Sequence, residues 1–484
     1  MKFLTLVVIG VPFFFNIVKA QAQTPIQFQH SYGHFNYNFG MCIKQLADTG
    51  YVILANVSDA ETNTNIYLFK IDKYGTFEWD MLFEDTAIFW AEKMVMTPDS
   101  GFIITGYTNK IKDAGYNIFL LKTNALGQKE WLRFYGGHNW DFGMDVAVDS
   151  SGNFFVTGST YSFSDSDKDV YILKLDAYGD TIWTRTYGGL QSDAGRSIYV
   201  CQNQDIVVAG YTNSFGNGHY DALMLRYDNN GNYLWSNTYG GDYDDKVFDV
   251  KELEDGSFIL IGYTESFGNN SAYYYMVKTF ANGQLHWHKI DGWSGGHIGN
   301  DKGYVLDLTY DGGFVFLGSS TWNVYQDLFL FKTDISGNWM FSTTYGGMGT
   351  ETPGYILQTL DSCFIIVGTS TYYGNHLNNI YIVKTGLTGT SIPYNNISEK
   401  YTRIYHELSI FPNPFSDYAT VSFEEPCEGI CTFEVFNSMG QRVKKKHIQS
   451  NSFYLSSENL NSGIYFYRLS NNLTTKSTGK FVVH

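Results

Sequence analysis

The chain has 484 residues, of which 44% are hydrophobic and 18% aromatic, with 49 glycines and 8 prolines. This length allows a large repeat array and one further module, and the profile is typical of short strands joined by glycine-containing turns rather than of helices. A net charge of −16 disfavours nucleic acid or an anionic membrane surface as a partner.

Residues 1–22 are predicted to be a secretory signal peptide. Lys2 supplies the positive start, residues 3–18 are the apolar region, and Ala20 and Ala22 are small residues suited to cleavage. The alternative, a transmembrane anchor, would need a longer apolar run. No Cys follows the cleavage region, so we do not expect lipid attachment.

A repeat of 52 residues occupies most of the chain. Each copy places a glycine four residues before a tryptophan and a basic residue nine before it. The tryptophans are Trp79, Trp131, Trp183, Trp235 and Trp287; the basic residues are Lys70, Lys122, Lys174, Arg226, Lys278, Lys332 and Lys384. Phe341, before "TTYGG", takes the tryptophan position in the sixth copy, and seven copies are counted.

Each copy is predicted to form four strands. In the third copy these are residues 143–149, 153–160, 169–176 and 180–189. Between the last two, Asp176 can accept turn N–H groups, and Gly179 suits the positive φ of a short hairpin. A repeated four-stranded meander predicts the blades of a β-propeller.

The seventh copy stops after Gly389 without its fourth strand, and the chain begins its repeats with that missing piece. Phe28 stands at the tryptophan position and Tyr32-Gly33 at the Tyr-Gly position. Because an unclosed ring would leave two sheet edges exposed, we expect this first strand to pair into the last blade. The predicted fold is all-β, with a seven-bladed β-propeller over 26–391 closed by an N-terminal strand, and then a linker over 392–406.

The repeats resemble the bacterial β-propeller repeat family in three phrases: "DALMLRYDNNGNYLWSNTYGG" (221–241), "DSSGNFFVTGST" (149–160) and "EDGSFILIGYT" (254–264). The resemblance covers about residues 26–391 and implies architecture rather than activity. The first two copies depart from it, with "LANVS" (54–58) and "MLFED" (81–85).

Residues 407–484 are predicted to form a small Ig-like β-sandwich, because short alternating segments are separated by turns. The phrases "LSIFPNPF", "FEVFNSMGQRV", "LNSGIYFYRL" and "TGKFVV" resemble the type A sorting domain of the type IX secretion system of Bacteroidota. The residues that carry this resemblance are Pro412, Asn413, Pro414, Gly440, Gly463 and Lys480. His484 is an unusual last residue for that family, and an ordinary structural sandwich is the alternative.

The resemblance implies export in two steps, through the inner membrane by the signal peptide and across the outer membrane by the sorting domain. It also implies removal of that domain, with the product either released or attached to surface lipopolysaccharide. The type IX secretion machinery is then an expected partner.

Five cysteines in a chain of this length do not form a disulfide framework. Cys427 and Cys431 are close enough to pair, and the sequence leaves open whether they do. Cys42, Cys201 and Cys363 occupy non-equivalent repeat positions and are predicted to be small buried residues.

No strong catalytic motif is present. The glycine-rich pieces precede strands and not helices, so they are not phosphate loops. His286 and His288 share a strand face but lack a nearby third metal ligand, and the Asp-x-x-Gly turns differ in spacing from sialidase Asp boxes. We therefore do not predict an enzyme. The alternative, a hydrolase acting on polysaccharide, would need two converging carboxylates on the loops or in the central channel.

Three sets of residues that recur in the copies could be functional or structural. One is a set of acidic residues, each six positions after the tyrosine of Tyr-Gly-Gly. Their carboxylates could bind calcium, but we expect each carboxylate to stabilise its own turn instead. The tryptophan set is predicted to pack between blades, and the basic set to cap the third strands toward solvent. The acidic set is Asp141, Asp193, Asp245 and Glu351, with Asn38 in the first copy. The sequence predicts no cofactor, with calcium as the one alternative.

The loops between the second and third strands vary most among the copies and project from one face. They mix aromatic and small polar residues, which suit sugar stacking or protein contacts. The candidate binding residues are Tyr220, Tyr273, Tyr274, Tyr275, Trp322, Tyr372 and Tyr373. The predicted function is a secreted or surface-displayed module that binds or scaffolds extracellular glycan or protein; a purely structural envelope protein is a further alternative.

Overall fold

The computed structural model describes residues 27–59, 63–111, 115–268, 271–291, 301–322, 325–392, 408–423, 431–437, 441–448, 450, 452–470 and 475–484. These residues form strands and turns, and no helix long and apolar enough to cross a membrane is found among them. The predicted signal peptide, the linker beyond residue 392, Cys427, Gly440 and the side chain of Trp322 lie outside this part.

Six four-stranded sheets follow one another along the chain, each a meander of consecutive antiparallel strands. The first three are β2 (Tyr37–Gln45), β3 (Tyr51–Ser58), β4 (Asn65–Ile71) and β5 (Phe77–Phe83); β6 (Phe89–Met96), β7 (Phe102–Thr108), β8 (Asn117–Thr123) and β9 (Lys129–Tyr135); and β10 (Asp141–Val148), β11 (Phe154–Thr160), β12 (Asp169–Leu175) and β13 (Thr181–Tyr187). The next three are β14 (Asp193–Val200), β15 (Ile206–Thr212), β16 (Asp221–Tyr227) and β17 (Tyr233–Tyr239); β18 (Asp245–Glu252), β19 (Phe258–Thr264), β20 (Tyr273–Thr279) and β21 (Leu285–Asp291); and β22 (Lys302–Leu308), β23 (Phe314–Trp322), β24 (Tyr325–Thr333) and β25 (Trp339–Tyr345).

A further four-stranded sheet joins the two ends of the repeat array. It contains β26 (Glu351–Gln358), β27 (Phe364–Ser370), β28 (Asn379–Lys384) and β1 (Phe28–Tyr32). β1 pairs antiparallel with β28, from Phe28 opposite Lys384 to Tyr32 opposite Ile380. The first strand of the repeats therefore supplies the missing fourth strand of the last copy, as the sequence predicts.

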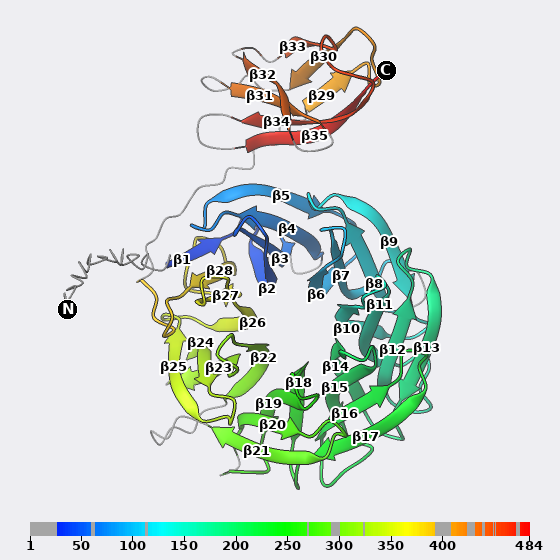
Figure 1. Ribbon diagram of the computed structural model, residues 1–484, viewed down its shortest axis with the longest axis vertical. Helices are drawn as coiled ribbons and strands as arrows, with labels where there is room; N and C mark the ends of the chain where they lie inside the picture. Colours follow the sequence, from blue (N-terminus) through cyan, green and yellow to red (C-terminus); the bar gives the residue numbers. More distant parts are fainter. Residues whose placement is uncertain are drawn as a thin grey trace, which may run out of the picture.

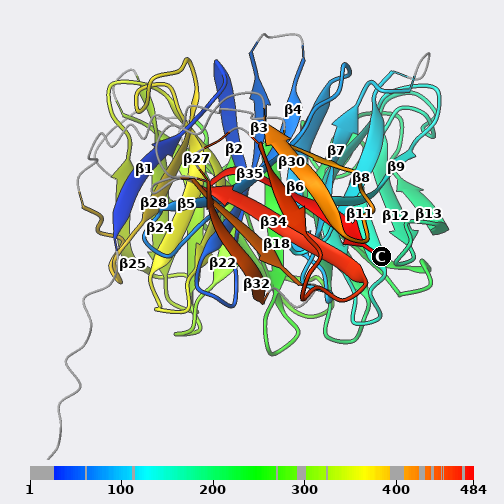
Figure 2. The same cartoon turned by 90° about the horizontal axis from the view of Figure 1, so that it is seen from above.

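The sheets are arranged as a ring, in which the first strand of each copy lies nearest the axis and the fourth lies at the rim (Figure 1). Seen from the side, the strands run between two faces that carry the turns and loops (Figure 2). We call the face with the second-to-third-strand loops and the connections between sheets the loop face. The opposite face, with the tight hairpins, is the turn face.

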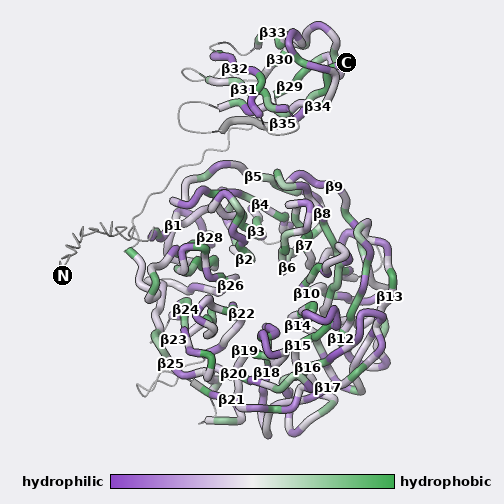
Figure 3. The backbone as a smooth tube through the Cα atoms, viewed as in Figure 1, coloured by the Kyte–Doolittle hydropathy of each residue, from purple (hydrophilic) through white to green (hydrophobic). Residues whose placement is uncertain are grey.

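The core lies between neighbouring sheets. Every residue of β11 and β12 is buried, because each sheet is covered on both sides and its middle strands become continuous apolar runs. One core cluster, for example, joins Val207 of β15 to Val247 of β18 and Phe258 of β19. Hydrophobic residues recur along the strands of each sheet, and the turns are more hydrophilic (Figure 3).

The repeated tryptophans pack against the hairpin of the next sheet, as predicted. A Cβ added to Gly179 would lie 3.1 Å from the Trp131 ring, and one added to Gly389 would lie 2.9 Å from Phe341. The tyrosine of Tyr-Gly-Gly reaches the same hairpin, because the Tyr135 hydroxyl donates to the Gly179 carbonyl at 2.6 Å. Tryptophan and tyrosine together hold one sheet to the next.

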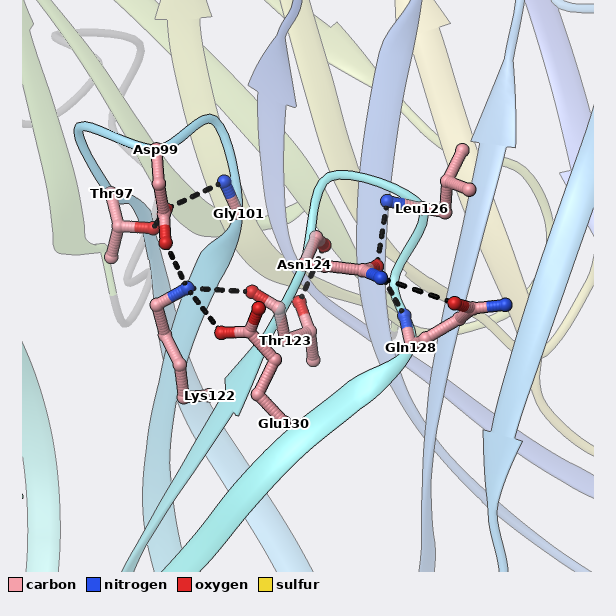
Figure 4. A network of polar contacts seen from close by, with 9 residues as sticks. All are labelled: Thr97, Asp99, Gly101, Lys122, Thr123, Asn124, Leu126, Gln128 and Glu130. Atoms are coloured by element: carbon pink, nitrogen blue, oxygen red, sulfur yellow. Dashed lines mark hydrogen bonds and ion pairs between the residues drawn. The ribbon is translucent and has the colours of Figure 1, made fainter. Parts of the chain in front are cut away.

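The basic set differs from its prediction, because these amines are buried rather than directed to solvent. Lys122 is 5% exposed, and its Nζ donates to Asp99 at 2.8 Å, Glu130 at 2.9 Å and the Thr123 carbonyl at 2.9 Å (Figure 4). Burial alone would raise the pKa of Asp99, but the bonds from Lys122 and Thr97 outweigh it and lower that pKa to about 2. The amine thus ties the third strand to the hairpin between the first two, which a period in sequence does not reveal.

The C-terminal strands form two sheets, one ordered β29-β30-β33 and the other β32-β31-β34-β35. The strands are β29 (Leu408–Phe411), β30 (Tyr418–Phe423), β31 (Cys431–Phe436), β32 (Arg442–Ile448), β33 (Ser452–Ser456), β34 (Gly463–Ser470) and β35 (Thr475–Val483). Their apolar side chains form a core cluster of their own that includes Phe433 and Phe481.

Residues of the Pro-Asn-Pro phrase hold the last strand. The Asn413 side chain accepts a hydrogen bond from Val482 N–H at 2.8 Å, and Pro412 and Pro414 flank it. Gly463 begins β34, opposite Val483, and Lys480 is exposed on β35.

The cysteines separate into two groups. Cys42, Cys201 and Cys363 are free and at most 1% exposed, as predicted for small core residues. Cys431 is disulfide-bonded, and Cys427, whose pairing with it the sequence leaves open, lies outside the described residues.

Candidate binding site at the bulges of the innermost strands

Each innermost strand carries a β-bulge at the same position. In the third copy Gly143 lies opposite Gly158 and Asp145 opposite Thr157, which leaves Met144 between them without a partner residue. A bulge adds one residue to one strand and redirects its side chain. The bulged residues of the seven sheets, which we call the bulge ring, are Met41, Glu92, Met144, Arg196, Phe248, Tyr304 and Gly354.

A glycine in the second strand allows this bulge. A Cβ on Gly158 would overlap the carbonyl oxygen of Phe142, and one on Gly262 would overlap that of Lys246. The glycine of the repeated Gly-Tyr-Thr or Gly-Ser-Thr phrase therefore suits the close approach of the two backbones. "LANVS" departs here, with Ala55 opposite Gly40.

The bulge ring is the position where a repeated frame carries different side chains, including an acid, a base, an aromatic ring and a thioether. Its members are half-buried, and four of them touch across sheets. The Arg196 guanidinium lies 3.2 Å from the Met144 sulfur and 5.5 Å from the centre of the Phe248 ring. Phe248 in turn stacks on Tyr304, with ring centres 5.3 Å apart. Four successive sheets thus contribute to one continuous surface.

Aromatic rings and lysines adjoin the bulge ring toward the loop face. The Lys246 Nζ lies 3.7 Å from the centre of the Tyr220 ring and 5.0 Å from that of Tyr211. Lys302 Nζ lies 4.3 Å from the centre of the Tyr263 ring, which also stacks on Phe248. Ligand-binding sites are lined mainly by hydrophobic and aromatic side chains with a few polar groups, and this surface has that composition.

A second aromatic group lies at the second and third sheets. Tyr107 contacts Phe142 with ring centres 5.0 Å apart and Tyr116 at 5.4 Å. Trp140 joins them through Tyr116 at 6.2 Å and is 54% exposed. This group extends the aromatic surface to the rim of the loop face.

Charged side chains meet on the turn-face side of the bulge ring. The Lys44 amine donates to the Tyr355 hydroxyl at 3.0 Å, and the Lys44 and Lys93 amines lie 4.4 and 4.5 Å from the centre of the Tyr355 ring. Lys93 belongs to the second copy and Tyr355 to the seventh. Their contact therefore joins two sheets that are not neighbours in the ring. Burial alone would lower the pKa of Lys251. The Asp249 carboxylate, 3.1 Å from the amine, outweighs burial and raises this pKa above its ordinary value, so the amine stays charged.

Two acidic residues that belong to none of the repeated sets approach the same serine here. The Ser197 hydroxyl lies 3.1 Å from Asp145 Oδ2 and 2.9 Å from Asp249 Oδ1. Each carboxylate also accepts a backbone N–H of a neighbouring innermost strand, Asp145 from Ile198 at 2.9 Å and Asp249 from Leu306 at 3.0 Å. Both acids are at most 5% exposed, and they connect sheets.

The predicted loop residues are only partly brought together. Tyr220 adjoins the bulge ring through Lys246, Tyr273 is half-buried at the start of β20, and Tyr372 is 45% exposed. Tyr274 and Tyr275 were predicted as loop residues, but this was wrong: they lie in β20 and are at most 3% exposed in the core.

Of the remaining two loop residues, Tyr373 packs on Tyr381 with ring centres 4.9 Å apart and donates to the Gly346 carbonyl at 2.7 Å. It therefore supports a turn. The backbone of Trp322 ends β23, and its side chain lies outside the described residues.

The acidic set lies on the loop face, one member per sheet, and all four carboxylates are 0% exposed. Asp141 accepts Gly137 N–H at 2.8 Å and the Ser162 hydroxyl at 2.7 Å; Asp193 accepts Gly189 N–H at 3.0 Å. Each acid thus holds its own connection to the loop beside it. Asp245 and Glu351 make the equivalent bonds to Gly241 at 2.8 Å and Gly347 at 3.3 Å, and Asn38 accepts His34 N–H at 3.2 Å.

No group of three or more His, Cys, Asp or Glu side chains suited to a metal is found in the described part of the chain. His286 stacks on Phe280 and His288 on Phe267, with ring centres 4.5 and 4.6 Å apart. Calcium binding by the acidic set stays a prediction.

Sequence reasoning missed the bulge ring because it looked for variation in loops. The available signal was the third residue after each member of the acidic set, which changes from copy to copy inside an otherwise repeated strand. Recognising it requires knowing that a bulge turns this residue toward the axis.

Comparison with known families identifies the C-terminal module. Residues 409–484 match the secretion system C-terminal sorting domain, which confirms the resemblance drawn from its phrases. The match implies engagement with the type IX secretion machinery and export to the cell surface or the extracellular space.

The remainder of the chain has distant likenesses. A stretch of 175 residues is 27% identical to part of the regulatory protein FlaEY of Caulobacter vibrioides, covering 31% of this chain and 18% of FlaEY. PorZ of Porphyromonas gingivalis, a surface component of the type-IX secretion system, aligns with a TM-score of 0.41 and 11% identity over 92% of this chain and 59% of PorZ. The β-propeller domain of the Trilobed protease from Pyrococcus furiosus aligns with a TM-score of 0.43 and 8% identity, over 75% of this chain and 98% of that domain. With TM-scores below 0.5, neither structural likeness carries an argument about this chain.

Proposed function

We propose that this chain is a seven-bladed β-propeller, carried to the cell surface or beyond by an Ig-like sorting domain, that binds an extracellular glycan at the bulge ring. The observation that carries the proposal is the bulge ring itself. All seven sheets repeat the frame around it, whereas the side chains that it presents differ.

The surroundings of the ring support a glycan rather than a nucleic acid or a lipid surface. Aromatic rings such as Phe248 and Tyr304 are only half-buried, so part of their surface is accessible for a sugar ring to pack against. Lys302 and Arg196 supply hydrogen-bond donors beside them. The net charge of −16 opposes nucleic acid and anionic membranes.

The test is binding of the purified chain to a panel of neutral and acidic polysaccharides, followed by titration calorimetry. The double variant Phe248→Ala, Tyr304→Ala should weaken binding about tenfold or more, because aromatic anchors contribute most of the energy at such sites. Tyr178→Ala is the matched control, since Tyr178 is 74% exposed on a turn-face hairpin. Equal loss in both, or no binding to any polysaccharide, would overturn the proposal and favour a protein or envelope scaffold.

A hydrolase is the competing function, because Asp145 and Asp249 converge on Ser197. Glycoside hydrolysis needs two carboxylates free to face the bond between sugars. Here each carboxylate is bonded to a backbone N–H of a neighbouring strand, which favours a structural use. Release of sugar fragments during the binding assay, lost in Asp145→Asn, would establish the hydrolase instead.

A further inference from the structure

We infer that the ligand of the bulge ring is an anionic polysaccharide, whose carboxylate or sulfate groups are bound by Arg196 and Lys302. This inference rests on the proposed function and specifies its ligand. A net charge of −16 opposes polyanions at long range, but salt screens that effect beyond about 10 Å, so the inference depends on the cations that would contact the ligand directly.

Arg196 stands in the bulge ring of the fourth copy. Its side chain contacts the Met144 sulfur at 3.2 Å and the Phe248 ring at 5.5 Å, and within the described residues no carboxylate lies within ion-pair distance of it. Glu92 is an acid with which it interacts electrostatically. Burial raises the pKa of Glu92, whereas Arg196 and Lys93 act in the opposite direction.

Lys302 lies two residues before the bulged Tyr304. Its amine sits 4.3 Å from the centre of the Tyr263 ring, and no ion pair to it is found in the part of the chain that the structure describes. A cation held on an aromatic face keeps its remaining N–H donors available to an anionic group.

A third cation nearby is already paired. Lys246 contacts Asp244 at 3.1 Å and lies on the Tyr220 ring, and Glu265 is a further acid of this region because it acts on Tyr263. The deeper lysines Lys93 and Lys251 face the acids that join the strands, including Asp249. Arg196 and Lys302 are therefore the cations in contact with Phe248 or Tyr263 for which no ion pair is found among the described residues.

Phe248 links these two cations. Its ring contacts the Arg196 guanidinium, and it stacks on Tyr304 at 5.3 Å and on Tyr263 at 5.9 Å, the ring that carries Lys302. The arrangement places half-buried aromatic surface between two positive groups. A sugar ring with an acidic substituent matches this order of apolar and anionic surface, whereas a neutral sugar would leave both charges without a partner.

The experiment compares three polymers, alginate for carboxylates, dextran sulfate for sulfates and unmodified dextran as the neutral reference, with the full chain. We expect binding to alginate or dextran sulfate that weakens as salt is raised, because pairs near the surface are screened. The double variant Arg196→Met, Lys302→Met should lose about tenfold or more of this affinity, the loss expected when charge-assisted hydrogen bonds are removed. Arg196→Lys should recover part of it.

Lys73→Met is the matched control. Lys73 is exposed on the turn face, where its amine lies 5.0 Å from the centre of the Tyr74 ring, so this variant removes one positive charge and one amine–ring contact and is compared with the single change Lys302→Met. Near-native thermal unfolding of the double variant excludes a folding defect. A fold-defective double variant is replaced by the single changes.

The outcomes separate the two claims. Dextran binding that is insensitive to salt, lost in Phe248→Ala, Tyr304→Ala and retained in Arg196→Met, Lys302→Met, would overturn the anionic ligand and keep the glycan site. Equal weakening by Lys73→Met would show attraction by surface charge alone and also overturn it. Silence toward all three polymers would overturn the anionic ligand together with the glycan proposal.

Discussion

Three pairs of carboxylates lie between neighbouring sheets on the loop face: Asp169 with Asp193, Asp221 with Asp245, and Asp327 with Glu351. In each pair both side chains approach the first glycine of Tyr-Gly-Gly, where an added Cβ would overlap them. Like charges this close and this buried favour uptake of a proton. Burial, together with the neighbouring carboxylates, raises the pKa of Asp169 to about 6.

The pair of Asp327 and Glu351 makes a pH dependence testable. Burial, and then Asp327 beside it, raises the pKa of Glu351 from 4.5 to about 7, so folding takes up a proton between these values. The stabilisation is complete below about pH 4.5 and is lost as pH rises through about 7. Between about pH 5 and pH 8 we expect the free energy of unfolding to fall by about 1–3 kcal/mol from this pair.

Urea unfolding of the native chain and of Glu351→Gln at both pH values measures this effect. The amide cannot ionise, so the variant should lose less stability than the native chain on going to the higher pH. Glu254→Gln, at an exposed position, should leave the native pH dependence unchanged. Parallel pH profiles for Glu351→Gln and the native chain would contradict the assignment.

At the scale of single elements, the bulge decides what each innermost strand presents. Without it, pairing would continue in register, and the side chains beyond it would exchange faces of the sheet. In the third copy the glycine opposite it permits the close approach, because a side chain at Gly158 would overlap the carbonyl of Phe142.

Gly158→Ala should therefore destabilise the chain by about 2–4 kcal/mol, as expected when a buried backbone must shift. Gly152→Ala is the control in the same sheet. Gly152 has a φ of +83° and nothing within 4 Å of an added Cβ, so its cost should be only about 1 kcal/mol from backbone strain. Urea unfolding of both variants checks the order, and equal losses would show that the close approach is unimportant.

At the scale of the whole molecule, the ring depends on β1, which comes from the opposite end of the repeat array. β1 covers the edge of β28, Phe28 is 3% exposed, and the Tyr32 hydroxyl donates to the Gly75 carbonyl at 2.6 Å. The strand thus completes one sheet and also contacts the next.

Deleting residues 27–33 should lower the unfolding temperature and promote association, because the edge of β28 and the apolar side chains beneath it become exposed. A peptide of residues 26–33, "IQFQHSYG", should raise the unfolding temperature of the truncated chain in a concentration-dependent manner. A peptide with the same residues in scrambled order is the control. An unchanged unfolding temperature after the deletion would contradict a closing role for β1.

Much of the architecture could be predicted from local chemistry. The tryptophan period, the hairpin glycines and the split copy at Phe28 each report a contact that every sheet repeats, so the sequence predicted the four-stranded units and the pairing of β1 with β28. The C-terminal phrases predicted the sorting domain in the same way, because such residues serve the same local turns wherever they occur.

The candidate site consists of residues from different copies, which only the ring of sheets brings into contact. Arg196 and Phe248 are 52 positions apart in sequence, and their contact exists only because neighbouring sheets meet at the axis. Lys122 was expected in solvent, because its pattern is that of an exposed strand end, yet the hairpin with Asp99 covers it. Burial and convergence between sheets are properties of the closed ring, and no single repeat contains the information that specifies them.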